Sequence, residues 1–384
     1  MKVVILSKAL HSIAYRRKTD AIAAQPGIEL TVVVPPSWRE PRAAELHYED
    51  GPTPNYRVIP LPLMFNGRHH IHWYPGFARL LRTLKPDVVH VDEESFNAAT
   101  AMAIRAADSI GAASCFYNYA NIERTYPPPF GWFEHYVFRT AAHAIACSHE
   151  AAAIIQRHGY TGPLSILPQT GVDPDLYAPS TTQPMANESF MLGYVGRFVP
   201  EKGIADLISA LAMLPKHYRL TLVGAGSDEH RLRQHAQTAG VADRISWCTP
   251  IATTDMPAMM RSFDLLVLPS RTTANWKEQF GRVLIEAMAC GVPPVGSDSG
   301  EIPHVIGNGG RTFPEGDAAA LARCVSDICS QPTYHAELRV RARQRILDCY
   351  TQQALAAQYV AIYHQMHAHI SARTQSTSRQ NERS

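Results

Sequence analysis

The sequence predicts an α/β protein of two domains, each built on a doubly wound parallel sheet. Short runs rich in Val and Ile alternate along the 384 residues with longer stretches of helical period, which is typical of buried parallel strands covered by helices. The alternation stops in a linker rich in Pro, Thr and Ser, residues 169–189, and then starts again. Ligands bind beyond the carboxyl ends of such strands, so two domains facing a central cleft are expected.

The first domain, residues 1–168, is expected to contain seven strands. Lys85-Pro86-Asp87 ends a helix, because the residue before a proline disfavours helical backbone, and it leads into the apolar run Val88-Val89-His90-Val91. By the same reasoning strands are predicted near residues 2–6, 28–34, 56–61, 87–91, 113–117, 143–147 and 164–167.

The second domain, residues 190–350, repeats the pattern with six strands. These are predicted near 190–195, 219–223, 244–247, 264–268, 292–296 and 310–313, with helices near 202–214, 227–239, 254–262, 280–290, 300–307 and 317–330. From Thr333 the chain is expected to be helical to about His369. Residues 351–370 form a C-terminal helix for which the first domain is a candidate packing surface. Residues 371–384 are nearly devoid of apolar side chains, so a disordered tail is predicted there.

Composition excludes several classes of protein. The 36 Lys and Arg against 34 Asp and Glu leave a formal charge of +2, whereas a dedicated nucleic-acid binder carries a large basic excess. Seven cysteines without a C-x-x-C pair predict neither a disulfide framework nor a structural metal. The apolar run at the N-terminus is too short for a signal peptide, and no segment is long enough to span a bilayer. A cytoplasmic location is therefore expected.

Two cations at a strand end point to the chemistry of the second domain. The strand at 190–195 ends at Gly196-Arg197, and Lys202-Gly203 opens the next helix. Such a turn presents backbone N–H groups and the positive end of a helix at the carboxyl edge of the sheet. With one guanidinium and one ammonium added, a diphosphate site that needs no metal is predicted. The spacing alone also fits a surface turn with solvated side chains.

A second segment carries two carboxylates eight positions apart, Glu278 and Glu286. An ionised carboxylate only accepts hydrogen bonds, which suits a ribose diol or a sugar ring. Phe280 and Gly281, at the expected start of a helix, would leave free amides for a phosphate. A capping glutamate followed by a solvated one is the alternative, but Glu286 lies inside an apolar run, which a solvated face does not explain.

Together these motifs resemble the retaining nucleotide-sugar glycosyltransferases of family 4, glycosyl transferases group 1. That family has the GT-B fold of two Rossmann-like domains facing a central cleft. The resemblance rests on Gly196-Arg197, on Glu201-Lys202-Gly203, and on Glu278 and Glu286 with the run Ala287-Met288-Ala289-Cys290-Gly291-Val292-Pro293 after them. It covers essentially the whole second domain and, more weakly, the linker and the topology of the first.

The resemblance implies a hexosyltransferase that moves a sugar from a nucleotide diphosphate to a hydroxyl acceptor, which could be a glycan, lipid-linked or a small molecule. Arg197 and Lys202 would bind the diphosphate and stabilise the leaving group, and Glu278 would contact the donor sugar; these three are the expected catalytic residues. The expected donor-binding residues are Gly196, Phe280, Gly281, Arg282 and Glu286, of which Glu286 would hold the ribose. Neither a metal nor another cofactor is expected.

The first domain departs from the family pattern. Family members often have a Gly-Gly loop after the first strand, where this chain has Ser7-Lys8-Ala9, and a His where it has Asn121. Asn121 is a candidate contact to the acceptor or sugar, although a loop-capping Asn is favoured. Asp92, at the end of the strand at 87–91, is a second candidate, either for an acceptor hydroxyl or as a base. The neighbouring Glu93 is read as a helix cap.

Three further features are weighed as structural. Asp173-Pro174-Asp175 has the Asp-x-Asp form of a metal motif but is read as a turn. The run containing His69, His70 and His72 has no metal-ligand spacing. Arg16-Arg17-Lys18 could contact anionic lipid at the inner membrane face as a peripheral patch, but a solvated helix face is favoured.

Other functions remain open at this stage. A nucleotide-sugar epimerase could share the fold, whereas a phosphorylase would need a cofactor lysine for which there is no signal. A non-catalytic two-lobed ligand-binding protein would predict a secretory signal and would not explain the convergence of charged residues. A dehydrogenase is disfavoured, because no G-x-G-x-x-G follows the first strand.

Overall fold

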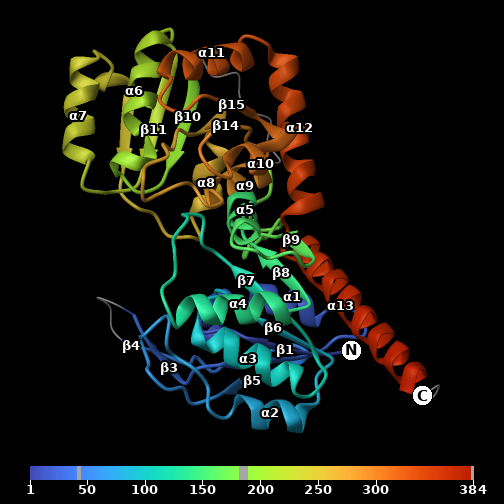
Figure 1. Ribbon diagram of the computed structural model, residues 1–384. Helices are drawn as coiled ribbons and strands as arrows, with labels where there is room; N and C mark the ends of the chain where they lie inside the picture. Colours follow the sequence, from blue (N-terminus) through green and yellow to red (C-terminus); the bar gives the residue numbers. More distant parts are fainter. Residues whose placement is uncertain (41–44, 181–188, 382–384) are drawn as a thin grey trace. The chain divides into compact units, whose positions relative to one another are not determined.

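The computed structural model describes residues 1–40, 45–180 and 189–381, with side chains to residue 369. The chain forms two compact units (Figure 1). Unit 1 comprises Met1–Thr170 together with the C-terminal part from Gln352, and unit 2 comprises Gly171–Thr351.

Unit 1 is built on a seven-stranded parallel sheet in the order β5-β2-β1-β6-β7-β8-β9. The seven predicted strands are confirmed: β1 (Lys2–Leu6), β2 (Glu29–Val34), β5 (Tyr56–Pro60), β6 (Val88–Val91), β7 (Ala113–Asn118), β8 (His143–Ala146) and β9 (Leu164–Ile166). A short antiparallel pair, β3 (Ser37–Arg39) and β4 (Glu45–His47), was not predicted. Its three-residue strands are too short to show a clear period of two.

Helices cover both faces of this sheet because its central strands are apolar on both sides. In β1, Val3 and Ile5 pack toward one face and Val4 and Leu6 toward the other, as the two-residue period of a strand requires. The helices of the unit are α1 (Arg17–Ala23), α2 (Phe77–Leu84), α3 (Ala98–Asp108), α4 (Phe130–Thr140), α5 (His149–Arg157) and α13 (Gln352–Asn381), with short 3-10 helices η1 (Ala9–His11) and η2 (Ile13–Tyr15).

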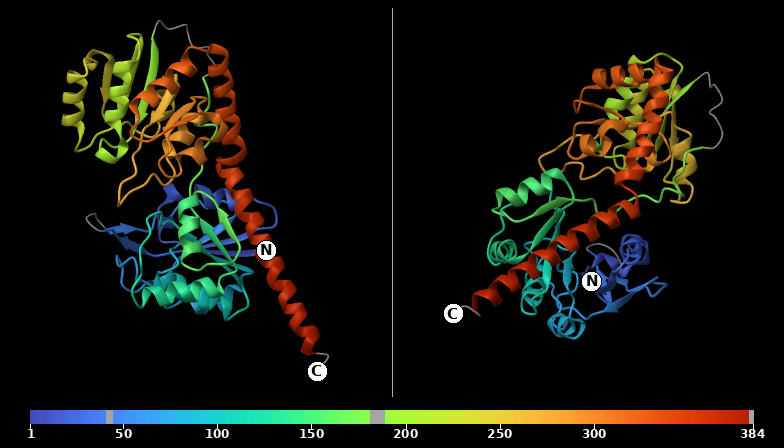
Figure 2. Two further views of the ribbon diagram at one scale, coloured as in Figure 1. Left: turned by 45° about the horizontal axis from the view of Figure 1, so that its top comes forward. Right: turned by 90° about the vertical axis from the view of Figure 1, so that its right-hand side faces the viewer.

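The C-terminal helix α13 completes the core of unit 1. It packs against α1 and against β6 and β7 (Figure 2). Tyr359 and Tyr363 are fully buried in the same apolar cluster as Val3 and Ile5. One face of the N-terminal sheet is therefore covered by residues that follow unit 2 in the chain.

Two expectations for the C-terminal region are corrected. The single helix expected from Thr333 is divided into α12 (Pro332–Cys349) and α13, since Tyr350 leaves the helical backbone at φ −127° and accepts a hydrogen bond from the backbone of Val172. The backbone is also helical to Asn381, where a disordered tail was expected. Extending an existing helix needs no new nucleus, and residues 371–381 contain no Gly or Pro.

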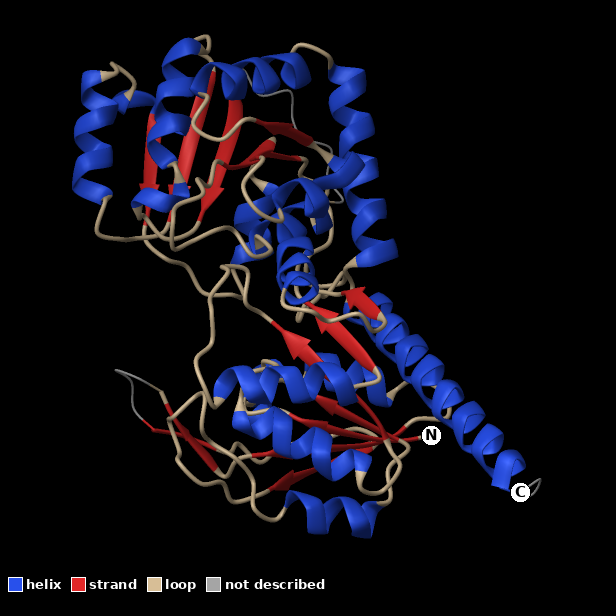
Figure 3. Cartoon of the chain, in the orientation of Figure 1, coloured by secondary structure: helices blue, strands red, loops and turns tan. Residues whose placement is uncertain are grey.

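Unit 2 has a six-stranded parallel sheet in the order β12-β11-β10-β13-β14-β15, with helices around it (Figure 3). Its strands confirm the prediction: β10 (Phe190–Val195), β11 (Tyr218–Val223), β12 (Ile245–Cys248), β13 (Leu265–Leu268), β14 (Pro294–Ser297) and β15 (Arg311–Phe313). Its helices are η3 (Pro200–Lys202), α6 (Ile204–Met213), α7 (Glu229–Thr238), η4 (Ala242–Arg244), α8 (Met256–Arg261), α9 (Arg282–Ala289), α10 (Ile302–Ile306), η5 (Gly307–Gly309), α11 (Ala318–Cys329) and α12.

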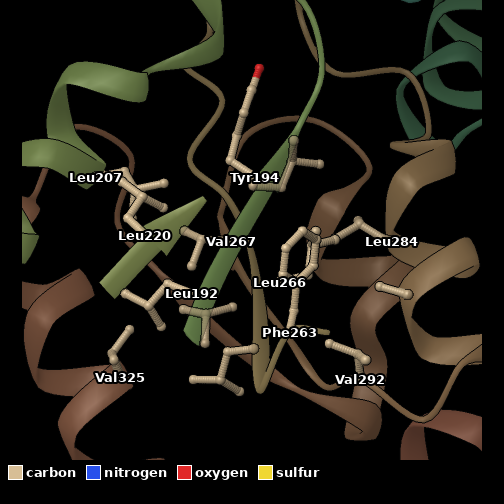
Figure 4. Packing of buried hydrophobic residues seen from close by; sticks show 14 of the residues in the cluster. Leu192, Tyr194, Leu207, Leu220, Phe263, Leu266, Val267, Leu284, Val292 and Val325 are labelled. Atoms are coloured by element: carbon tan, nitrogen blue, oxygen red, sulfur yellow. The ribbon is translucent and has the colours of Figure 1, made fainter. Parts of the chain in front are cut away.

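The core of unit 2 is continuous from the sheet to the helices around it. Leu192, Leu220 and Leu266 of neighbouring strands lie together with Leu207 of α6 and Leu284 of α9 (Figure 4). This packing holds the starts of α6 and α9 against the sheet, and both helices begin where the sequence placed the phosphate and sugar contacts.

Within the described residues, no helix is both long and apolar enough to cross a lipid bilayer.

A close backbone contact fixes the start of α6. Gly203 has φ +64°, and a Cβ atom added there would lie 1.9 Å from the carbonyl oxygen of Pro269, just after β13. The β10–α6 turn and the loop after β13 thus approach each other at a point that only glycine permits.

We expect Gly203→Ala to lower the free energy of unfolding by about 3 kcal/mol, the sum of left-handed strain and steric overlap. The control is Gly240→Ala: Gly240 has φ +69° but no heavy atom within 4 Å of an added Cβ, so only the strain of about 1 kcal/mol applies. Urea unfolding of the three proteins measures both. Equal losses for the two variants would refute the importance of the contact with Pro269.

Candidate functional site

The first part of the site is the turn after β10. Gly196 continues the sheet, since its N–H donates to the carbonyl of Val223 at 3.0 Å, and Tyr194 donates its hydroxyl to the carbonyl of Arg197 at 2.9 Å. The backbone of Arg197 is held in this way while its side chain is exposed. Within the described part of the chain, its guanidinium has no hydrogen bond or ion pair, so it can reach an anion.

Lys202 lies at the end of η3, immediately before Gly203. Its Nζ donates to Oε2 of Glu278 at 2.6 Å and lies 4.7 Å from the centre of the Trp276 ring. The side chain is only 14% exposed. A lysine ammonium is otherwise mobile and strongly hydrated, so these two partners give it a defined position at the edge of the sheet.

Glu278 is fixed from several directions. Ser270, two residues after β13, donates its hydroxyl to the same Oε2 at 3.0 Å. The backbone carbonyl of Glu278 accepts from the N–H of Glu301 at 3.0 Å. The structure therefore brings together Lys202 and Glu278, two residues that lie 76 positions apart in the sequence.

The start of α9 supplies the second carboxylate. Gly281 caps the helix in the left-handed region at φ +73°. Arg282 and Glu286, one turn apart, form an ion pair with Nε and Oε1 at 3.1 Å. The Glu286 side chain is 12% exposed, and burial raises its pKa, an effect that Arg282 partly opposes. The ring of Phe280 packs against that of Tyr350, with the ring centroids 5.8 Å apart.

The two remaining candidates, Asp92 and Asn121, belong to unit 1, whereas this cluster belongs to unit 2. Asp92 is 3% exposed, and both of its oxygens are engaged: Oδ2 accepts from the Ser7 hydroxyl at 2.9 Å and Oδ1 from the Tyr119 hydroxyl at 2.7 Å. Lys18 and these hydroxyls outweigh burial and hold the pKa of Asp92 below its usual value. Asp92 is thus a buried carboxylate in the interior of unit 1. Asn121, three residues after β7, is also buried, at 7% exposure.

Sequence reasoning missed a second charged cluster of unit 1. Lys8, in the loop after β1, pairs with Glu93, which is 1% exposed and lies 3.9 Å from Nε2 of His72. Glu93 is therefore an ion-pair partner rather than a simple helix cap. Burial also raises the pKa of the neighbouring Glu94 to about 8. The only sequence signal was the run of three acidic residues, which cannot show which cation each one meets.

The basic patch is corrected as well. Arg16 and Lys18 are 2% and 3% exposed, so of the run Arg16-Arg17-Lys18 only Arg17 is exposed. Arg16 donates to the carbonyls of Leu10, His11 and Glu49. The run is neither a lipid-binding patch nor a solvated helix face.

The predicted turn at Asp173-Pro174-Asp175 is confirmed. Oδ1 of Asp173 accepts from the N–H groups of Asp175 and Leu176 at 3.0 and 3.2 Å. That oxygen serves the local backbone, which is the role of an Asp in such a turn.

Two family models match the chain, one in each half. The family model described as Glycosyltransferase Family 4 matches residues 21–176, and the one described as Glycosyl transferases group 1 matches residues 182–345. One curated relative is the GDP-mannose-dependent alpha-(1-6)-phosphatidylinositol monomannoside mannosyltransferase of Mycolicibacterium smegmatis. It is 30% identical over 250 residues, a match that covers 59% of this chain and 65% of the relative. The chain thus spans somewhat less than two thirds of that relative's length.

Solved structures share the fold over nearly the whole chain. HepE of Anabaena, solved in complex with UDP, superposes with a TM-score of 0.69 at 19% identity, covering 94% of this chain and 99% of HepE. Sucrose-phosphate synthase of Thermosynechococcus elongatus superposes with a TM-score of 0.66 at 20% identity, covering 96% and 99%. With two parallel α/β sheets of the GT-B fold and both halves of the chain matched, this protein belongs to the family 4 glycosyltransferases, the glycosyl transferases group 1.

Proposed function

We propose that this protein is a retaining glycosyltransferase that moves a hexose from a nucleotide diphosphate to a hydroxyl acceptor. The observation that carries the proposal is the Lys202 ammonium, held between Glu278 and Trp276 at the carboxyl edge of the unit 2 sheet. The exposed Arg197 lies at the same edge, in the turn that leads to Lys202. The curated relative from Mycolicibacterium smegmatis is named as a GDP-mannose-dependent transferase, which supports a nucleotide-sugar donor.

In this proposal the diphosphate of the donor binds at the β10–α6 turn. Arg197 and Lys202 offset its charge, and that charge grows as the bond to the sugar breaks. Interactions that strengthen with developing charge lower the barrier more than they improve ground-state binding. The main contribution of the two cations is therefore to the leaving group.

Glu278 and Glu286 bind two other parts of the donor. The Lys202 and Ser270 contacts both use Oε2 of Glu278, which leaves Oε1 to accept from a hydroxyl of the donor sugar. Glu286, on α9, accepts from the ribose hydroxyls, and the start of α9 directs backbone N–H groups at a phosphate. Gly196, Phe280 and Gly281 contribute to donor binding through their backbones. Arg282 contributes through its ion pair with Glu286.

Retention of configuration follows if the acceptor attacks from the face that the diphosphate leaves. The leaving phosphate oxygen then takes the proton of the acceptor hydroxyl, so no protein nucleophile is required. Such a route depends on alignment and charge stabilisation. With Asp92 engaged in the interior of unit 1, we propose no protein base.

We expect Lys202→Met to lower kcat about 100-fold, because one charged contact to the leaving group is lost. Nucleoside diphosphate release from UDP-glucose, UDP-N-acetylglucosamine, GDP-mannose and ADP-glucose, with and without an acceptor panel, measures it. Arg82→Gln, at an exposed arginine of α2 in unit 1, is the control and should keep the wild-type rate. Unchanged kcat in Lys202→Met, or no turnover of any donor, would refute the proposal.

We expect donor binding to weaken as pH falls through the raised pKa of Glu286, because the ionised carboxylate is the form that only accepts hydrogen bonds. The raised pKa places this change at a higher pH than for an exposed glutamate. In Glu286→Gln the donor KM should be higher by about tenfold, about 1.4 kcal/mol, as for one hydrogen bond. It should also lose this pH dependence. A pH profile of KM identical in both proteins would contradict the role.

We expect transfer to persist in excess EDTA, since two side-chain cations replace a divalent metal in the proposed site. Rates after dialysis against EDTA, and after return of Mg²⁺ or Mn²⁺, test this. A loss of activity that either ion restores would contradict a metal-independent reaction.

A further inference from the structure

A second ion pair joins the two segments that carry Lys202 and Glu278. Asp206 lies in the first turn of α6, and Arg271 directly follows Ser270. Nε of Arg271 donates to Oδ2 of Asp206 at 2.6 Å, and its Nη2 donates to Oδ1. The pair is therefore bidentate, the geometry that fixes orientation most strongly among ion pairs.

The backbone of Arg271 contacts the same turn on the other side of Lys202. Its N–H donates to the carbonyl of Glu201, the residue before Lys202, at 2.8 Å. The turn also closes on itself, since the N–H of Asp206 donates to the carbonyl of Gly203 at 2.9 Å. One residue thus holds the turn on both sides of Lys202.

Arg271 is itself on an anchored loop. The next residue, Thr272, donates its N–H to Oε2 of Glu315 at 2.6 Å, and its hydroxyl lies 2.9 Å from that of Ser299. Two residues before Arg271, the carbonyl of Pro269 lies against the backbone of Gly203. The loop after β13 is therefore a rigid base from which Arg271 can act on the turn.

We propose that Arg271 and Asp206 are positioning residues of the donor site: they hold the Lys202 backbone in register with Glu278 and so set where the ammonium lies. The inference rests on the proposed function. Lysine has a flexible side chain, so Glu278 can orient the Lys202 ammonium only if the distance between the turn and Glu278 is fixed. A misplacement of about 1 Å can cost about 100-fold in rate.

The pair is better suited to positioning than to stability. The Arg271 side chain is 48% exposed while that of Asp206 is 9% exposed. Water screens a pair whose arginine is half exposed, which keeps its net contribution to folding small, although removing that arginine leaves the buried Asp206 carboxylate unpaired. The loss of activity in an Arg271 variant should therefore exceed that caused by breaking a pair of matching burial elsewhere in unit 2.

Unit 2 contains a matched control. Asp228 and Arg231 form a bidentate pair at 2.6 and 2.7 Å, with side-chain exposures of 9% and 61%. The chemistry and burial resemble those of Asp206 and Arg271, but both partners lie at the start of α7 and their side chains bond each other. The contact of this segment with the turn is made by the backbone, from the N–H of Asp228 to the carbonyl of Phe198 at 3.0 Å, and Arg231→Gln does not remove it. Arg231→Gln thus removes the same kind of pair without the proposed effect.

The test is a double-mutant cycle of Arg271→Gln and Lys202→Met, measured as kcat and KM for nucleoside diphosphate release from the donors named above. We expect Arg271→Gln to lower kcat at least tenfold with little change in the acceptor KM. Its thermal unfolding midpoint should change no more than that of Arg231→Gln, which should keep the wild-type kcat. In Lys202→Met, adding Arg271→Gln should cause no further loss, because the two residues act as one. Arg271→Lys, which keeps the charge but not the bidentate contact, should recover part of the rate.

Four other results would overturn the inference, and the kinetic and unfolding data distinguish them. An unchanged kcat in Arg271→Gln, or an equal loss with and without Lys202→Met, shows that Arg271 does not act through Lys202. A loss that only follows the fall in unfolding midpoint shows a structural role. If Lys202→Met itself keeps full activity, the proposed function fails first, and the inference fails with it.

Discussion

The structure of the candidate site depends on one contact between segments far apart in the sequence, the meeting of the β10–α6 turn with the loop after β13. The backbone contact between Gly203 and Pro269 sets the distance, and the Lys202–Glu278 ion pair then joins a cation from one segment to a carboxylate from the other. Both segments follow adjacent parallel strands, β10 and β13. Because the carboxyl ends of parallel strands share one edge, the topology places them side by side before any side chain contributes.

The two units use buried charge differently. In unit 2 the paired charges lie at the sheet edge with Arg197 exposed beside them, an arrangement suited to an anionic ligand. In unit 1, Asp92, Lys18 and Glu93 are almost completely buried. Lys18 lies 4.0 Å from Asp92, which also accepts from the Ser7 hydroxyl, and Glu93 pairs with Lys8. Buried carboxylates and ammonium groups must be paired to offset the loss of hydration. Each carboxylate of the acidic run after β6, Asp92, Glu93 and Glu94, accordingly has at least one partner within unit 1.

The C-terminal helix links the two ends of the chain in one core. Tyr363 of α13 lies with its hydroxyl 2.7 Å from Nδ1 of His90, and burial lowers the pKa of that histidine to about 3. His90 is therefore neutral under α13, as an interior position requires. The core of unit 1 is therefore complete only with residues that follow unit 2 in the chain.

The sequence by itself determined the two parallel sheets, all thirteen predicted strands and the segments that carry Arg197, Lys202, Glu278 and Glu286. It could do so because strand and helix periods, glycines at turns and strand-to-helix order are local features. Tertiary structure alone decided that Asp92 is engaged by Ser7 and Tyr119, that Arg16 and Lys18 are buried, and that Arg271 meets Asp206. The physical reason is that burial and ion pairing depend on which distant segments the fold brings together. No spacing along the chain records that choice.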